Sequence, residues 1–234
     1  MSKKVVVATV GMFFFTILCL TGCGGGGGSV GTTNTPTPTG TVISLAAFNS
    51  VYFGTAAGAQ FSFPALFGSD SQWRAWSGSL TIIADGATTF EGQSVTKQRA
   101  LNTLQVAGGA SISGTSTSYF QAVSGYPYKF IGCDGVTFIP NQSMTLPDSA
   151  KVGDSGDLGT YAGTDSTTQY SAWSLSAGFN GGSTLTLSTT TKTGTTPNSV
   201  EIDSFQLDAT GTPTSFSASL TKNGLTVNLT GSKS

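Results

Sequence analysis

The 234-residue chain contains no histidine. This absence excludes a Ser-His-Asp or Cys-His catalytic arrangement, an imidazole metal ligand and a histidine switch near neutral pH. Charged residues are also scarce, at 9% of the chain against about 25% in a typical protein. The hydrophobic fraction of 38%, with 10% aromatic residues, is nevertheless too high for a disordered chain. We therefore expect a packed globular protein with few charges.

Cysteine and basic residues are rare as well. Cys19 lies within an apolar N-terminal segment and Cys23 follows it, so Cys133 is the one thiol further along the chain. An intramolecular disulfide is therefore not expected. Beyond residue 22, eight Lys or Arg stand against eleven Asp or Glu, a net charge of −3. Without a basic stripe, nucleic acid is not an expected partner.

The N-terminus has the pattern of an export signal. Lys3 and Lys4 precede an apolar run over residues 5–20, as in secretory signal peptides. This run of 16 residues is shorter than the roughly 20 that span a bilayer. It ends in Leu20-Thr21-Gly22-Cys23, which resembles the lipobox of bacterial lipoproteins. The resemblance implies a lipoprotein signal peptide over residues 1–22 and a diacylglycerol on Cys23; an ordinary signal with an incidental Cys is the alternative.

Lipidation of Cys23 would hold the chain on a membrane surface, because two or more acyl chains anchor stably. Gly24, and not Asp, follows Cys23, so in a cell with two membranes the resemblance implies the outer one. Residues 23–40 are rich in Gly, Thr and Pro and predict a flexible linker after the lipidated Cys. Residues 41–234 are then expected to form a single domain.

Short strands are the dominant pattern of residues 41–234. Apolar residues alternate with small polar ones, as in Leu225, Val227 and Leu229, which is the period of a half-buried strand. Turn dipeptides separate these runs: Asp85-Gly86, Asp134-Gly135, Asn180-Gly181 and Asn223-Gly224. The sequence therefore predicts an all-β, mainly antiparallel sandwich or small barrel built from hairpins. The best helical candidate is the short segment Ser44 to Phe53.

Two parts of this domain correspond weakly. Four residues recur 95 positions later, and Ala75-Trp76-Ser77 recurs as Ala172-Trp173-Ser174. The four pairs are Gly58 and Gly153, Gly68 and Gly163, Asp70 and Asp165, and Lys97 and Lys192. A duplicated β unit would make two similar halves around one core. Chance matching in a chain rich in Gly, Ser and Thr is the alternative.

Acidic residues are densest between positions 148 and 165: Asp148, Asp154, Asp157 and Asp165. Paired carboxylates can hydrolyse glycosides or bind calcium, but the spacing matches neither pattern and turn formation explains most of these residues. Gly153-Asp154-Ser155-Gly156 resembles the nucleophile motif of trypsin-like proteases, yet the chain has no histidine base. We expect no enzymatic activity, no cofactor and no metal; Asp154 and Asp157 are the weak metal candidates.

Aromatic residues are the remaining candidates for binding. On the surface of a β domain, Trp76, Trp173, Tyr126 and Tyr128 could stack against a sugar or an apolar ligand; packing in the core is the alternative. The segment from Leu146 to Gly156 resembles segments of β-rich lipoproteins of two-membraned bacteria and implies no activity. The first hypothesis is a non-enzymatic, membrane-anchored envelope lipoprotein with a structural or interaction role. The second is a module that binds a glycan or an apolar ligand, and the third is a hydrolase using the acidic cluster. The expected partners are the membrane and an envelope protein or glycan.

Overall fold

The computed structural model describes residues 40–109, 111–178 and 182–234. The predicted signal peptide, Cys23 and the linker up to residue 39 lie outside the described residues, as does the predicted turn at Asn180-Gly181. Among the residues described, no helix is long and apolar enough to cross a membrane.

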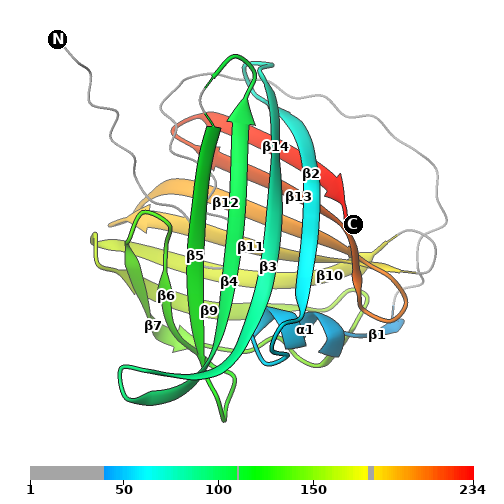
Figure 1. Cartoon of the computed structure of the whole chain (residues 1–234), viewed down its shortest axis with the longest axis vertical. Coiled ribbons are helices and arrows are strands. Elements are labelled where there is room, and N and C mark those ends of the chain that lie inside the picture. Colours follow the sequence, from blue (N-terminus) through cyan, green and yellow to red (C-terminus); the bar gives the residue numbers. More distant parts are fainter. Residues whose placement is uncertain (1–39, 110, 179–181) are drawn as a thin grey trace.

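The described chain consists of strands and one short helix (Figure 1). In chain order the elements are β1 (Val42–Ser44), α1 (Ala46–Tyr52), β2 (Gln60–Asp70), β3 (Ala75–Phe90), β4 (Gln93–Val106), β5 (Ser111–Gln121), β6 (Pro127–Ile131), β7 (Thr137–Ser143), β8 (Ser149–Lys151), β9 (Ser155–Gly163), β10 (Thr167–Ala177), β11 (Ser183–Thr193), β12 (Thr196–Leu207), β13 (Pro213–Lys222) and β14 (Leu225–Ser232). The all-β prediction is confirmed, and α1 lies within the segment that the sequence favoured as a helix.

Twelve of the strands close into one antiparallel barrel. They form two successive six-stranded meanders, β2 to β7 and β9 to β14, which are joined where β14 pairs with β2 and β7 pairs with β9. A short strand precedes each meander, and these two strands, β1 and β8, pair with each other. Asp70 and Asp165 each accept the backbone N–H of the residue two positions later. The chain is therefore organised as two halves with the same order of strands.

The core lies between two walls of the barrel. Figure 1 shows β2 to β5 running along one wall, while the strands of the second meander cross behind them. Inward side chains of both walls are mostly apolar and buried, among them Phe63, Leu80 and Phe205. Helix α1 lies at one end of the barrel and inserts Phe48, whose ring packs 5.1 Å from that of Phe205. Aromatic pairs stabilise a fold by more than their buried area alone. Helix α1 therefore closes this end of the barrel with apolar side chains, and we call it the helical plug.

The outward positions are mostly small and polar. On β11 and β13 they are half-buried or exposed hydroxyl side chains: Thr184, Thr186, Ser188, Thr190, Ser215, Ser217, Ser219 and Thr221. Branched threonine is well accommodated on an exposed strand surface. The predicted alternation of apolar and polar residues thus becomes an apolar interior and a hydroxyl-rich exterior.

Two predicted turns are confirmed and one is wrong. Asn223-Gly224 joins β13 to β14 with positive φ at both residues, and Asp134-Gly135 lies between β6 and β7. Asp85-Gly86 instead lies inside β3, at a register shift between Ala84 and Gly86. Arg99 of the neighbouring strand donates to both carboxyl oxygens of Asp85, at 2.6 and 2.7 Å. A positive-φ glycine therefore forms a bulge here, and the pairing of β3 with β4 continues past it.

Candidate functional site

Both tryptophans predicted as ligand-binding residues lie in the core. Trp76 is 2% exposed, and its indole Nε1 donates to Asp70 Oδ2 at 3.0 Å. Trp173 is 9% exposed and belongs to the same apolar cluster. Each occupies an inward position of its strand, so neither ring is exposed for stacking against a ligand, and both pack in the core, which is the alternative the sequence left open. Their indole rings contribute buried area to the fold.

The two predicted tyrosines lie near the connection between β5 and β6. Tyr126 is 46% exposed. Tyr128 is half-buried, and its hydroxyl donates to Glu91 Oε2 at 3.1 Å. The Phe90 ring lies between its neighbours, stacked on Tyr119 and edge-on to Tyr128. These contacts tie Tyr128 into a surface cluster, so of the four predicted residues Tyr126 is the exposed one.

The predicted acidic cluster is not gathered into one site. Among the residues described, no three His, Cys, Asp or Glu side chains form a group that could hold a metal ion. Asp154 and Asp165 accept backbone N–H groups of nearby residues, Lys151 and Thr167, as the turn interpretation expects. Asp148 and Asp157 instead accept side-chain hydrogen bonds from residues distant in the chain, Asn49 and Tyr170. The turn interpretation therefore fits Asp154 and Asp165. Cys133 is half-buried and forms no disulfide within the described ranges.

A polar surface that the sequence did not reveal lies on the inner wall formed by β10, β11 and β12. Register places Thr191 opposite Gln169 and Ser199, and Thr189 opposite Ser171 and Glu201. The Gln169 amide donates to Thr191 Oγ1 at 3.2 Å, and the hydroxyls of Ser171 and Thr189 lie 3.0 Å apart. We call the buried residues of this wall the polar inner patch: Gln169, Ser171, Thr189, Thr191, Ser199, Glu201 and Asp203.

The polar inner patch contains two buried acids. Glu201 and Asp203 share one face of β12, and each is 3% exposed. Within the described part of the chain, both carboxyl oxygens of Glu201 and Oδ1 of Asp203 have no hydrogen-bond partner, and no Lys or Arg is buried. Burial raises the pKa of both groups well above the usual range, and Asp203 raises the pKa of Glu201 further. An acid in such surroundings is held neutral unless a cation accompanies it.

One member of the acid pair, Asp203, acts electrostatically on Tyr52 of the helical plug. Burial raises the pKa of the Tyr52 hydroxyl, and nearby Tyr161 and Asp203 raise it further. Tyr52 therefore lies within electrostatic range of both residues. Tyr161 in turn borders a small pocket between β5, β6 and β7, whose volume of about 10 Å³ holds roughly one water molecule.

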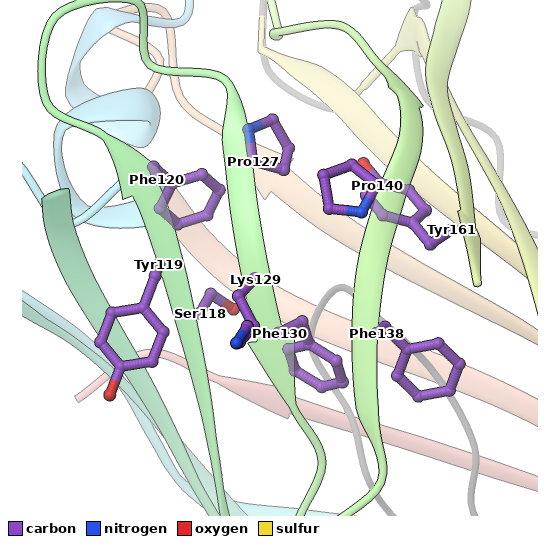
Figure 2. A pocket seen from close by; sticks show the side chains of 9 residues that line it. All are labelled: Ser118, Tyr119, Phe120, Pro127, Lys129, Phe130, Phe138, Pro140 and Tyr161. Carbon is purple, nitrogen blue, oxygen red and sulfur yellow. The ribbon is translucent and has the colours of Figure 1, made fainter. Parts of the chain in front are cut away.

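The barrel wall is weakly paired beside this pocket. Figure 2 shows Pro127 and Pro140 facing each other across the pocket, with the rings of Phe130 and Phe138 further along the same strands. Strands β6 and β7 share two register pairs, whereas β3 and β4 pair along most of their length. Proline donates no backbone hydrogen bond. The wall between β6 and β7 is therefore held by few backbone hydrogen bonds.

A larger groove lies on the outside of the barrel, where β2 pairs with β14. Its volume of about 360 Å³ is within the range of small-molecule sites. Phe67 and Ile202 are 61% and 39% exposed, and the other lining residues carry no charge: Gly68, Ser69, Ser204, Ser217, Ala218, Ser219, Asn228, Leu229 and Thr230. We call this surface the outer groove. It combines an exposed aromatic ring with hydroxyl and amide groups.

Gly68 allows the two strands beneath the outer groove to approach closely. A Cβ atom at this position would lie 1.8 Å from the backbone oxygen of Asn228. Strands β14 and β2 share four register pairs, of which one joins Gly68 to Leu229. Phe67 directly precedes Gly68, so the close approach of the β2 and β14 backbones determines where the Phe67 ring lies on the surface. A second outer trough, of about 500 Å³ over β3, β4 and β5, is lined without an aromatic residue.

Comparisons with models of protein families, with curated proteins and with solved structures found no match to this chain. Function is therefore inferred from the chemistry of these surfaces.

Proposed function

We propose that the protein is an exported lipoprotein, anchored to the cell envelope through Cys23, whose barrel binds a neutral, hydroxyl-rich ligand of the glycan class. The outer groove is the observation that carries the binding role. Phe67 offers a flat apolar face of the kind that packs against the C–H face of a sugar ring. Asn228 and the surrounding hydroxyls supply donors and acceptors, and the uncharged lining favours a neutral ligand over an ionic one.

The same groove supports a non-enzymatic role. Acid–base and nucleophilic catalysis require a titratable or activated side chain within reach of the substrate. The lining of the outer groove contains serine and threonine hydroxyls but no carboxylate, lysine or cysteine that could activate them. Binding without chemical conversion is therefore the function that this surface supports best.

The binding role predicts a specific loss in the variant Phe67→Ala. Burying a phenylalanine side chain against a ligand contributes about 1.5–3 kcal/mol, so affinity should fall roughly tenfold to a hundredfold. Saturation-transfer NMR and titration calorimetry with gluco-oligosaccharides and N-acetylglucosamine oligomers would measure this. Tyr170→Ala is the matched control, because Tyr170 is an exposed aromatic residue outside the outer groove. Binding of none of these probes, or equal binding by Phe67→Ala, would contradict the glycan proposal.

The anchoring role predicts the behaviour of Cys23→Ser. Without the thiol no thioether to diacylglycerol can form, so incorporation of radiolabelled palmitate should be lost and the protein should leave the membrane fraction. Cys133→Ser should keep both the label and the membrane association. Labelling that persists in Cys23→Ser would rule out the lipid anchor while leaving the outer groove untested by that result.

A further inference from the structure

The unpartnered polar atoms of the polar inner patch are mainly oxygen acceptors. They are Oε1 and Oε2 of Glu201, Oδ1 of Asp203, Oε1 of Gln169 and the hydroxyl of Ser199. Gln169 is fully buried, and its amide nitrogen already donates to Thr191. Its carbonyl oxygen is therefore left on the same inner wall as the acid pair. Buried acceptors without donors are costly, so this wall is suited to a partner that supplies positive charge.

Charge balance limits what this partner can be. Two ionised carboxylates carry a charge of −2 inside the barrel, and no Lys or Arg of the described residues is buried with them. A buried charge must be paired or must coordinate a metal. One divalent cation compensates both carboxylates, whereas a monovalent ion leaves one of them uncompensated.

We propose that the polar inner patch binds one divalent cation of the hard, oxygen-preferring class, such as Ca²⁺, through Glu201 and Asp203. The chain offers no imidazole, and its patch contains no thiol, so softer metals that prefer nitrogen or sulfur are disfavoured. Calcium accepts carboxylate and amide oxygens together. Thr189 lies directly opposite Glu201, and its hydroxyl and that of Ser171 are the neutral oxygens in the same row as this acid. A single ion also needs less room than an organic amine, in a place where the carboxyl oxygens have almost no exposed surface.

The weakly paired wall between β6 and β7 lies close to the polar inner patch. Tyr161, which lines the small pocket there, lies opposite Gln169 of the polar inner patch in the pairing of β9 with β10. Opening this part of the wall disturbs few backbone hydrogen bonds, because β6 and β7 share two register pairs. The inference concerns the interior and does not rest on the glycan proposal for the outer groove.

Calorimetric unfolding of the intact chain tests the proposal. Metal is first removed with EDTA, and Ca²⁺, Mg²⁺ or Mn²⁺ is then added in excess. At a concentration about one hundred times Kd, the melting temperature should rise by roughly 5 to 10 °C for a domain of this size. The double variant Glu201→Gln with Asp203→Asn should lose this rise, whereas Asp154→Asn should keep it. A melting temperature unchanged by all three ions, or a double variant that responds like the native chain, would overturn the proposal.

Metal content gives an independent measurement if the double variant does not fold. Native mass spectrometry of the wild-type chain with Ca²⁺ should show one bound ion per chain. Tb³⁺ substituted at this site should luminesce on excitation of tyrosine, because Tyr52 lies near Asp203, and excess Ca²⁺ should quench the signal. Absence of a stoichiometric ion would mean that the two acids are neutralised by protons alone.

Discussion

The double variant Glu201→Gln with Asp203→Asn is expected to be more stable than the native chain at neutral and alkaline pH when divalent ions are absent. Both acids are buried without a cationic side chain, and burial raises the pKa of each. The folded state therefore binds more protons than the unfolded state above the ordinary carboxyl pKa of about 4. Stability is fully present below that pH and is lost as the pH rises toward the raised pKa values, by up to about 1.4 kcal/mol per pH unit for each group.

Urea unfolding in EDTA between pH 4 and 9 measures this effect directly. The native chain should lose stability steadily with rising pH, while the amide variant, which cannot ionise at these positions, should lose much less. The two curves should converge toward the acid end of this range, because both acids are neutral in the folded and the unfolded state only below the ordinary carboxyl pKa of about 4. Asp165→Asn alters an exposed turn and should follow the native curve. A native chain that is equally stable across this range without metal would contradict the assignment of a buried, uncompensated acid pair.

Divalent ions should counteract the fall in unfolding free energy that the native chain shows with rising pH. A metal binds ionised carboxylates and competes with protons, so its affinity rises with pH. If Ca²⁺ occupies the polar inner patch, the ion should raise the unfolding free energy of the native chain most at alkaline pH, where the metal-free chain is least stable. The combination of the two pH profiles therefore separates an acid pair that is merely protonated from one that coordinates a cation.

The sequence predicted the strands from local alternation but not how they close into a barrel. A period-two pattern identified the segment of β14, and Asn223-Gly224 identified a hairpin. Closure depends on pairs far apart in the chain, such as Gly68 with Leu229. Whether a glycine in a strand relieves contact with a neighbouring backbone is a property of that neighbour, here Asn228. One sequence without its partner strand does not contain this information.

The acid pair was missed because β12 carries two conflicting patterns. Val200 and Ile202 suggest that even positions face the core, whereas Phe205 and Leu207 suggest that odd positions do. The structure follows the second pattern: Ile202 is 39% exposed, and Glu201 is buried. In a strand without a bulge, every second residue faces the same side. Because Phe205 faces the core, Glu201 and Asp203 must face it too, and the sequence could have placed both acids in the interior on this ground. Conflicts of this kind mark places where a buried polar group serves a purpose other than stability.

The outer groove was missed for a different reason. Phe67 is one of fifteen phenylalanines, and nothing in its neighbourhood distinguishes an exposed ring from a buried one. The sequence argument favoured tryptophan, whose large ring is the better platform, and both tryptophans with matching neighbours proved to be core residues. Exposure of Phe67 results from the register shift in β2 between Phe63 and Leu66. Odd-numbered residues face the core before this shift and even-numbered residues face it afterwards, so Phe67 faces outward.

Asp70→Ala is expected to cause the second large effect, a loss of about 2–3 kcal/mol of unfolding free energy. The Asp70 side chain is fully buried and accepts hydrogen bonds from four groups. The donors are the backbone N–H of Gln72 (2.9 Å) and of Arg74 (3.0 Å), the Arg74 guanidinium (2.6 Å) and the Trp76 indole (3.0 Å). Removal of the carboxylate leaves the buried indole N–H and the guanidinium without this acceptor. Urea unfolding at pH 7 measures the loss, and Asp165→Ala, the corresponding turn residue of the second half, should cost about 1 kcal/mol or less.

The pH dependence at Asp70 should be opposite to that of the interior acids. Burial favours the neutral form, but hydrogen bonds from Trp76, Arg74 and Gln72 outweigh it and lower the pKa of Asp70. Its contribution to the unfolding free energy is therefore present above the ordinary carboxyl pKa and is lost as the pH falls through the lowered value.

Asp70 also pairs with Val227 at the junction of β2 and β14, three residues from Phe67. Asp70→Ala should therefore weaken binding of an oligosaccharide in the outer groove as well, whereas a variant that unfolds more easily but binds with native affinity would show that the groove does not depend on this junction.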